Sequence, residues 1–199
     1  NSEDIAATAY GIARGFPLFT KKTNQSSNKS IQILFTEKHS PSEIQIGLDA
    51  VRQAAQYTEM PTNFFGVNEF IQEAQRIAQM PGVKMTTIRG EELRDRGFGG
   101  VWSVGKAAKE APALIVLSWT PEHFNRSIAL VGKGITYDTG GLSIKSKTGM
   151  PGMKRDMAGA AVVLSVFEAA LKIGCSHKLT AILAVAENAI GPNALRPDD

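Results

Sequence analysis

The stretch Ile128–Asp156, IALVGKGITYDTGGLSIKSKTGMPGMKRD, organises the rest of the chain. It begins as an apolar strand and leads into a helix, through a connection far longer than the roughly two to six residues usual between such elements. Six glycines lie within it, and four of them, Gly132, Gly134, Gly140 and Gly141, fall between Val131 and Leu142. Because glycine tolerates positive φ and close backbone approach, the segment can aim Lys133, Asp138 and Lys145 into one small volume. Length and composition therefore predict a functional loop.

Apolar runs of strand length alternate with helical patterns on both sides of this stretch. The predicted strands are Val83–Ile88, Ala113–Trp119, Ile128–Gly132 and Leu179–Ala186. The predicted helices are Asn68–Met80, with Asn68 as its cap, Glu91–Arg96 and about Met157–Ile173. Near-continuous apolar strands that alternate with helices are typical of an α/β protein, with a mainly parallel sheet covered by helices on both faces.

The amino-terminal part has a different pattern. A small-residue helix (Ile5–Arg14), a polar loop (Lys21–Lys29) and a strand (Ile31–Phe35) are predicted there. A longer helix follows, with Ser40 as N-cap, Pro41 at the first helical position and Glu43 completing a capping-box pattern. Pro61 ends it. We expect this helix, over residues 40–60, to connect an incomplete first domain to a second domain.

The amino-acid composition argues against several classes of protein, among them membrane-spanning and nucleic-acid-binding proteins. The 199 residues are 43% hydrophobic and 21% charged, which is typical of a soluble globular protein. No apolar run reaches the roughly 18 residues that span a bilayer, and no secretory signal is visible. The net charge of +3 is scattered, so nucleic acid is not indicated. The single Cys175 excludes an internal disulfide and fits the reducing cytoplasm. We interpret the N-x-S sequons at Asn24, Asn28 and Asn125 as chance occurrences.

One nucleotide-binding motif is nearly matched. Residues Gly100–Ala107, GVWSVGKA, follow the phosphate-binding loop pattern except at the last position. Ala107 lacks the hydroxyl that would hold magnesium, and no apolar strand leads into Gly100. We interpret the segment as a glycine-rich turn that leads into a short helix.

The charged residues of the central stretch allow two interpretations. Asp138 and Asp156 are hard oxygen donors suited to divalent cations. Asp156 could instead cap the helix that follows, and Asp138 could form an Asx turn before Thr139. Lys133 and Lys145 could be ordinary surface lysines. Taken singly each residue favours a structural role, whereas the spacing of the whole set favours a catalytic one.

The set resembles the leucine aminopeptidase family, the dinuclear-metal cytosol aminopeptidases also called M17 peptidases. The motifs that carry the resemblance are VGKGITYDTGGLSIK (Val131–Lys145), MPGMKRD (Met150–Asp156) and AGAA (Ala158–Ala161). Softer similarity extends back to about residue 40. The wording of the motifs is most similar to an animal branch of the family known as probable aminopeptidases. The resemblance implies that residues 1–39 end a smaller α/β domain, and that residues 61–199 begin the catalytic metallopeptidase domain.

The resemblance also implies a reaction and a role for each residue. The family releases N-terminal amino acids from peptides by hydroxide attack at a site of two divalent ions, for which zinc, manganese and magnesium are all candidates. By similarity, Lys133 and Asp156 ligate one metal and Asp138 bridges both. Lys145 stabilises the oxyanion and binds substrate, and Met153 lines the pocket for the first side chain of the substrate. The expected partners are peptides with a free N-terminus and further copies of the chain in a hexamer, in the cytoplasm.

The chain departs from the family pattern in one respect. Two further carboxylate ligands and an arginine come from a downstream N-T-D-A-E-G-R motif in the family, and this motif is absent from the 199 residues. We therefore expect a central segment of an aminopeptidase that by itself binds metal weakly and hydrolyses little. The alternative is a non-catalytic truncated or degenerate copy that acts in peptide binding or subunit association.

Overall fold

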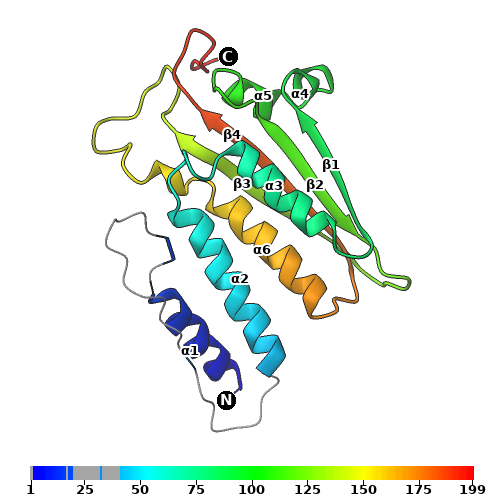
Figure 1. Cartoon of the computed structure of the whole chain (residues 1–199). Helices are drawn as coiled ribbons and strands as arrows, with labels where there is room; N and C mark the ends of the chain where they lie inside the picture. Colours follow the sequence, from blue (N-terminus) through cyan, green and yellow to red (C-terminus); the bar gives the residue numbers. More distant parts are fainter. Residues whose placement is uncertain (1, 17, 20–31, 33–40) are drawn as a thin grey trace.

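The computed structural model describes residues 2–16, 18–19, 32 and 41–199 (Figure 1). The predicted loop Lys21–Lys29, the predicted cap Ser40 and, apart from Gln32, the predicted strand Ile31–Phe35 lie outside the described residues. So do two of the sequons, at Asn24 and Asn28. No helix among the described residues is long and apolar enough to cross a membrane.

A four-stranded sheet forms the centre of the described structure. Its strands are β1 (Val83–Arg89), β2 (Ala113–Trp119), β3 (Ser127–Asp138) and β4 (Lys178–Asn188), in the spatial order β1-β2-β4-β3. β3 runs parallel to β4, whereas β1–β2 and β2–β4 are antiparallel. The α/β class is confirmed, but the described sheet is mixed, so the expectation of a mainly parallel sheet is corrected here.

The lengths of the connections explain the mixed pairing. A parallel pair needs a crossover that returns along the whole strand, and α6 (Ala158–Lys172), at about 1.5 Å per residue, is long enough to do so between β3 and β4. Between β1 and β2 lie only two short helices, α4 (Glu91–Asp95) and α5 (Gly99–Gly105). Neither can run back along a strand, so the chain re-enters the sheet at the edge where it left, with Arg89 opposite Ala113.

Helices cover one face of the sheet in layers (Figure 1). α3 (Val67–Ala78) and α6 bury their apolar sides against β2 and β4, in a core that includes Phe70, Ile77, Leu164 and Phe167. α2 (Pro41–Glu59) packs on α6, and α1 (Ser2–Arg14) packs on α2. Since the small residues Ala160 and Ala161 of α6 are fully buried, this helix lies close to the strands. Its amino-terminal end is thereby held at a fixed place above β3.

The opposite face is covered at one end only. α4 and α5 pack there, with Leu93 in a small cluster that contains Ile88 and Leu114. Along β3 the outward side chains stay exposed, and Val131 is 70% exposed. The expected helices on both faces are thus present, but those of the second face leave part of β3 and β4 open. That open region contains the residues described in the next section.

Most predicted elements agree with the structure, with two corrections. The helix α3 begins at Val67 with Gly66 as its cap residue, and Glu69 accepts a hydrogen bond from the Gly66 amide at 2.8 Å. Asn68, the predicted cap, is a helical residue whose side chain instead binds Glu110. The strand β3 continues well past the predicted end at Gly132, to Asp138. It brings Lys133 and Asp138 into the sheet rather than into the loop.

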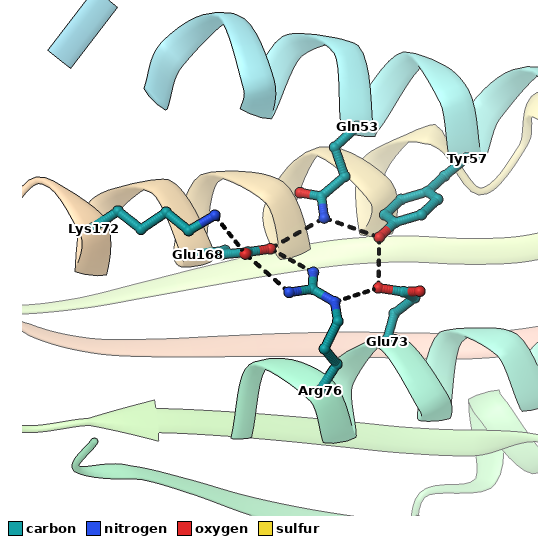
Figure 2. Close-up of polar contacts among 6 residues, drawn as sticks. All are labelled: Gln53, Tyr57, Glu73, Arg76, Glu168 and Lys172. Atoms are coloured by element: carbon teal, nitrogen blue, oxygen red, sulfur yellow. Dashed lines mark hydrogen bonds and ion pairs between the residues drawn. The ribbon is translucent and has the colours of Figure 1, made fainter. Parts of the chain in front are cut away.

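A polar cluster links α2, α3 and α6 (Figure 2). At its centre is Glu168, which is 4% exposed. Arg76 binds both of its carboxylate oxygens at 3.0 and 2.6 Å, and Lys172 and Gln53 donate to it at 2.7 and 3.1 Å. Burial alone would raise the pKa of Glu168, but these donors outweigh it and lower the pKa to about 2. The cluster therefore stabilises the ionised carboxylate.

We expect Glu168→Gln to lower the free energy of unfolding by about 2 kcal/mol at pH 7, because part of the linkage energy is screened where Arg76 and Lys172 reach solvent. The folded-state pKa lies below the ordinary value, so this contribution is present above about pH 4.5 and is lost as the pH falls toward 2. Urea unfolding of the wild type and the variant between pH 7 and pH 3 measures the difference. The exposed Glu122→Gln is the matched control. If the difference in unfolding free energy between the wild type and Glu168→Gln did not shrink at low pH, the ionised state assigned to Glu168 would be wrong.

Candidate metal centre

The carboxyl ends of β3 and β4 bring two polar side chains together. Asp138 and Asn188 are register partners in this parallel pair, after an irregularity that begins at Ile135. The Asn188 amide nitrogen Nδ2 donates to Asp138 Oδ1 at 2.8 Å. The backbone amide of Gly140 donates to the same oxygen at 2.9 Å, which is the Asx-turn contact that the sequence allowed. Asp138 is thus held by its own turn and by the neighbouring strand.

The loop over residues 139–157 folds back over this strand end. Lys145 N donates to the Thr139 carbonyl oxygen at 2.9 Å, and Leu142 N donates to that of Leu195 at 3.0 Å. Gly140 and Gly141 have positive φ, of 90° and 68°, and a side chain at either position would also meet backbone atoms closer than 3 Å. The predicted use of glycine is therefore confirmed at these two positions.

The two glycines nearest the start of the stretch act differently from the expectation. Neither Gly132 nor Gly134 has positive φ, and both lie in β3. A Cβ on Gly132 would lie 2.6 Å from Cα of Ala160 in α6. The absence of a side chain at Gly132 therefore lets the helix rest directly on the strand. This contact places the start of α6 beside Lys133.

Two lysine–aspartate pairs result from this packing. Lys145 Nζ lies 2.9 Å from Asp138 Oδ2, and Lys133 Nζ lies 3.0 Å from Asp156 Oδ2. The carboxylates are mostly buried, with side chains 16% and 23% exposed, whereas Lys133 is 62% exposed. The four residues that the sequence singled out thus form two ion pairs, one from the end of β3 to the loop and one from β3 to the turn before α6.

Asp156 does not cap the helix as the structural alternative proposed. The residue at the cap position of α6 is Met157, and no side chain makes a capping hydrogen bond there. Asp156 instead directly follows a short 3₁₀ turn, η1 (Met153–Arg155). Since its carboxylate is not used by the helix backbone, it is available to Lys133 or to a cation.

A hollow of about 480 Å³ lies on the open face of the sheet beside these pairs. Lys133, Asp138 and Asn188 line it on one side, and α5 lines it with Val101 and Val104. Of the other described candidates, Lys145, Asp156 and Met153 do not line it. Met153 is half-buried at the start of η1. The hollow is mainly apolar apart from the polar groups of β3 and β4.

The contacts of Asp138 favour its ionised form. Burial would raise the pKa of this carboxyl, but the hydrogen bonds from Lys145, Gly140 and Asn188 together lower it. An anionic carboxylate at the rim of a hollow can accept a cation. In this structure the cation beside Oδ2 of Asp138 is the ammonium group of Lys145.

The amine and carboxylate groups of the two ion pairs are of the kinds that bind divalent cations. The amine of Lys133 and the carboxylates of Asp138 and Asp156 belong to the two ion pairs, and such oxygen-rich sets suit zinc, manganese or magnesium. Within the described part of the chain, no group of three or more His, Cys, Asp or Glu side chains could hold a metal. A metal bound by these residues would therefore need a lysine amine beside the two carboxylates.

The segment that nearly matches a phosphate-binding loop is mostly helical. α5 covers Gly99–Gly105, and Lys106 at its end pairs with Asp199 at 3.9 Å. A helix does not present the successive backbone amides that wrap a phosphate. Gly100 is thus already helical and the turn follows at Lys106 and Ala107, so the expected order of a turn leading into a helix is wrong, while the expected short helix is present.

Sequence reasoning missed Asn188. A polar residue that ends an apolar strand at the carboxyl edge of a parallel pair is a recognisable signal, because ligand sites gather at that edge in α/β proteins. The run AVAEN (Ala184–Asn188) carries this signal. Only the strand order showed that it lies beside Asp138.

Comparison with known proteins gives one family. The profile of the Cytosol aminopeptidase family, catalytic domain, matches residues 52–199. The human protein called "Probable aminopeptidase NPEPL1" is 46% identical over 98% of this chain. The structure of Caenorhabditis elegans leucine aminopeptidase (LAP1) matches with a TM-score of 0.91 and 41% identity over 98% of this chain. The bottromycin maturation enzyme BotP in complex with Mn matches with a TM-score of 0.82 and 28% identity, also over 98%. The chain spans 40% of the human protein, 41% of the C. elegans chain and 42% of BotP.

Proposed function

The chain belongs to the cytosol aminopeptidase family, and on that premise we propose that its protein is a metal-dependent aminopeptidase that removes N-terminal residues from peptides. One observation carries the proposal: Lys133 and Asp138 of β3 line the same hollow, and each is held in an ion pair, with Asp156 and Lys145 respectively. These are four of the five site residues that the resemblance implied.

The roles proposed for the ligands follow the chemistry of the donors. Lys133 and Asp156, already in contact, would hold one divalent ion, and Asp138 would be shared between two. Lys133 must give up its proton to donate a lone pair, and its partner Asp156 would then bind the ion rather than the ammonium. The structure of the related BotP is a complex with Mn, which supports the use of a divalent ion in this protein. When bound, the ions would supply Lewis acidity and activate water near neutral pH.

Lys145 has a separate proposed task. Its ammonium group is partly buried, 31% exposed, and close to Asp138. A fixed positive charge there would stabilise negative charge on the carbonyl oxygen of the cleaved bond as the tetrahedral state forms. We propose that Met153, three residues before Asp156, contacts the first side chain of the substrate.

The proposal extends to partners and location. Substrates would be peptides with a free N-terminus, since removal of terminal residues requires recognition of that amine. Assembly into a hexamer and a cytoplasmic location are proposed from the family, whose name refers to the cytosol. We also propose that α2 connects a smaller amino-terminal domain to the catalytic domain, supported by its packing on α6.

The test uses the full-length protein encoded by the gene. We expect it to hydrolyse leucine amide but not N-acetyl-leucine amide, whose amine is blocked. Removal of metal by a chelator should lower the rate about 100-fold or more, and added Mn²⁺ or Zn²⁺ should restore it. Metal content measured on the same samples shows whether rate and occupancy change together. A full-length protein that binds no metal and hydrolyses neither amide would leave a role in peptide binding or subunit association instead.

A further inference from the structure

Asn188 has a buried side-chain oxygen that lacks a hydrogen bond among the described residues, which is unfavourable for a residue with a purely structural role. It is 8% exposed, and its Oδ1 is buried with no hydrogen-bond partner among the described residues. An unpaired buried acceptor costs roughly 1–3 kcal/mol, and an apolar side chain at the end of this strand would avoid that cost. The position therefore needs an explanation other than stability.

The orientation of the Asn188 amide follows from its contact with Asp138. Its Nδ2 lies 2.8 Å from the carboxylate oxygen Oδ1, and the opposite orientation would place two oxygens in contact. The main chain of Asn188 is held as well, because both the amide and the hydroxyl of Thr139 donate to its backbone carbonyl oxygen, at 3.1 and 2.6 Å. Asn188 is thus a donor from a fixed backbone position, aimed at one oxygen of Asp138.

The two oxygens of Asp138 are used differently. Oδ1 accepts from Asn188 and from the Gly140 backbone, which together use both of its lone-pair directions. Oδ2 accepts only from Lys145 among the described residues, and a lysine side chain can rotate away. Oδ2 is therefore the oxygen that can be given to a cation.

From this geometry we infer that Asn188 is a positioning residue for the metal site, which holds Oδ1 of Asp138 and leaves Oδ2 as the oxygen that binds the cation. The inference rests on the proposed function, since it requires that Asp138 is a ligand. Residues that orient a metal ligand typically change metal affinity or activity by about 10- to 100-fold when they are replaced.

The test compares two asparagines in the full-length protein with Co²⁺, whose visible absorption reports the geometry of its ligands. Asn188→Ala should weaken Co²⁺ binding about 10-fold or more and alter the absorption of the bound ion. Its Tm without metal should change little, because the orphaned acceptor is removed together with the donor. Asn68→Ala, which deletes contacts to Glu110 and Arg89 away from the hollow, should lower the Tm and leave the Co²⁺ spectrum unchanged. If Asn188→Ala does not fold, Asn188→Ser is read in its place.

The outcomes separate the two proposals. A wild-type spectrum and affinity in the Asn188 variants, with Co²⁺ bound, would overturn the positioning role while leaving the metal site intact. A wild-type protein that binds no Co²⁺ would overturn the metal site and, with it, the role of Asn188.

Discussion

Asp138→Asn is expected to lower kcat/KM for leucine amide by about 10³-fold or more in the full-length protein, and to reduce the bound metal. The substitution keeps the shape of the side chain but removes the charge that two neighbouring cations would share. A bridging ligand should cost more than the roughly 10- to 100-fold typical of residues that only orient a ligand. Steady-state kinetics with metal analysis of each preparation measures both effects.

The control for this variant is Asp95→Asn on α4. Asp95 also pairs with a cation, Arg94, at 2.9 Å, but it is exposed and lies outside the hollow. It should keep wild-type activity and metal content. If Asp138→Asn retained its metal and rate, the ligand assignment would be wrong even though the family assignment would stand.

Of the substitutions proposed for this protein, Gly132→Ala is expected to lower the free energy of unfolding most. Its Cβ would lie 2.6 and 2.8 Å from Cα and N of Ala160, both backbone atoms that no rotamer change can move. The helix α6 must therefore shift away from β3, at a cost of about 3 kcal/mol. For a domain of this size that lowers the Tm by roughly 6–12 °C, which thermal unfolding of the metal-free protein measures.

The same shift should also separate Lys133 from Asp156, because Lys133 belongs to β3 and Asp156 lies in the turn that leads into α6. Metal affinity is thus expected to fall together with the Tm. Gly99→Ala is the matched control, since a Cβ there meets no atom within 4 Å and the backbone is helical. A Tm for Gly132→Ala equal to that of Gly99→Ala would show that the strand and helix are less tightly packed than described.

Sequence patterns predicted a helix or strand well where the signal lies within that element itself. The strand Ala113–Trp119 agrees at both ends, and the helix α2 ends at Glu59, just before Pro61, as the proline indicated. β3 was predicted too short, because Gly132 and Gly134 resemble a loop while their place in the sheet depends on contact with α6. The cap of α3 was misplaced at Asn68 because the true cap, Gly66, has no side chain to mark it.

The charged residues of the candidate site were predicted from the sequence, but the contacts between them were not. Lys133, Asp138, Lys145 and Asp156 were found from the spacing of the motif and its resemblance to a family. Their actual pairing, Lys145 with Asp138 and Lys133 with Asp156, was not predicted. It depends on the close contact of α6 with β3, which is a relation between distant parts of the chain.

The sequence by itself determined the α/β class, the family and the residue types that can hold a metal, because periodicity, glycine spacing and charged motifs are properties of short stretches. Only the tertiary structure decided that β4 lies between β2 and β3 and that Asn188 therefore contacts Asp138. Strand order is set by the burial of whole faces and by the length of each crossover. These long-range terms have no signature within a single motif.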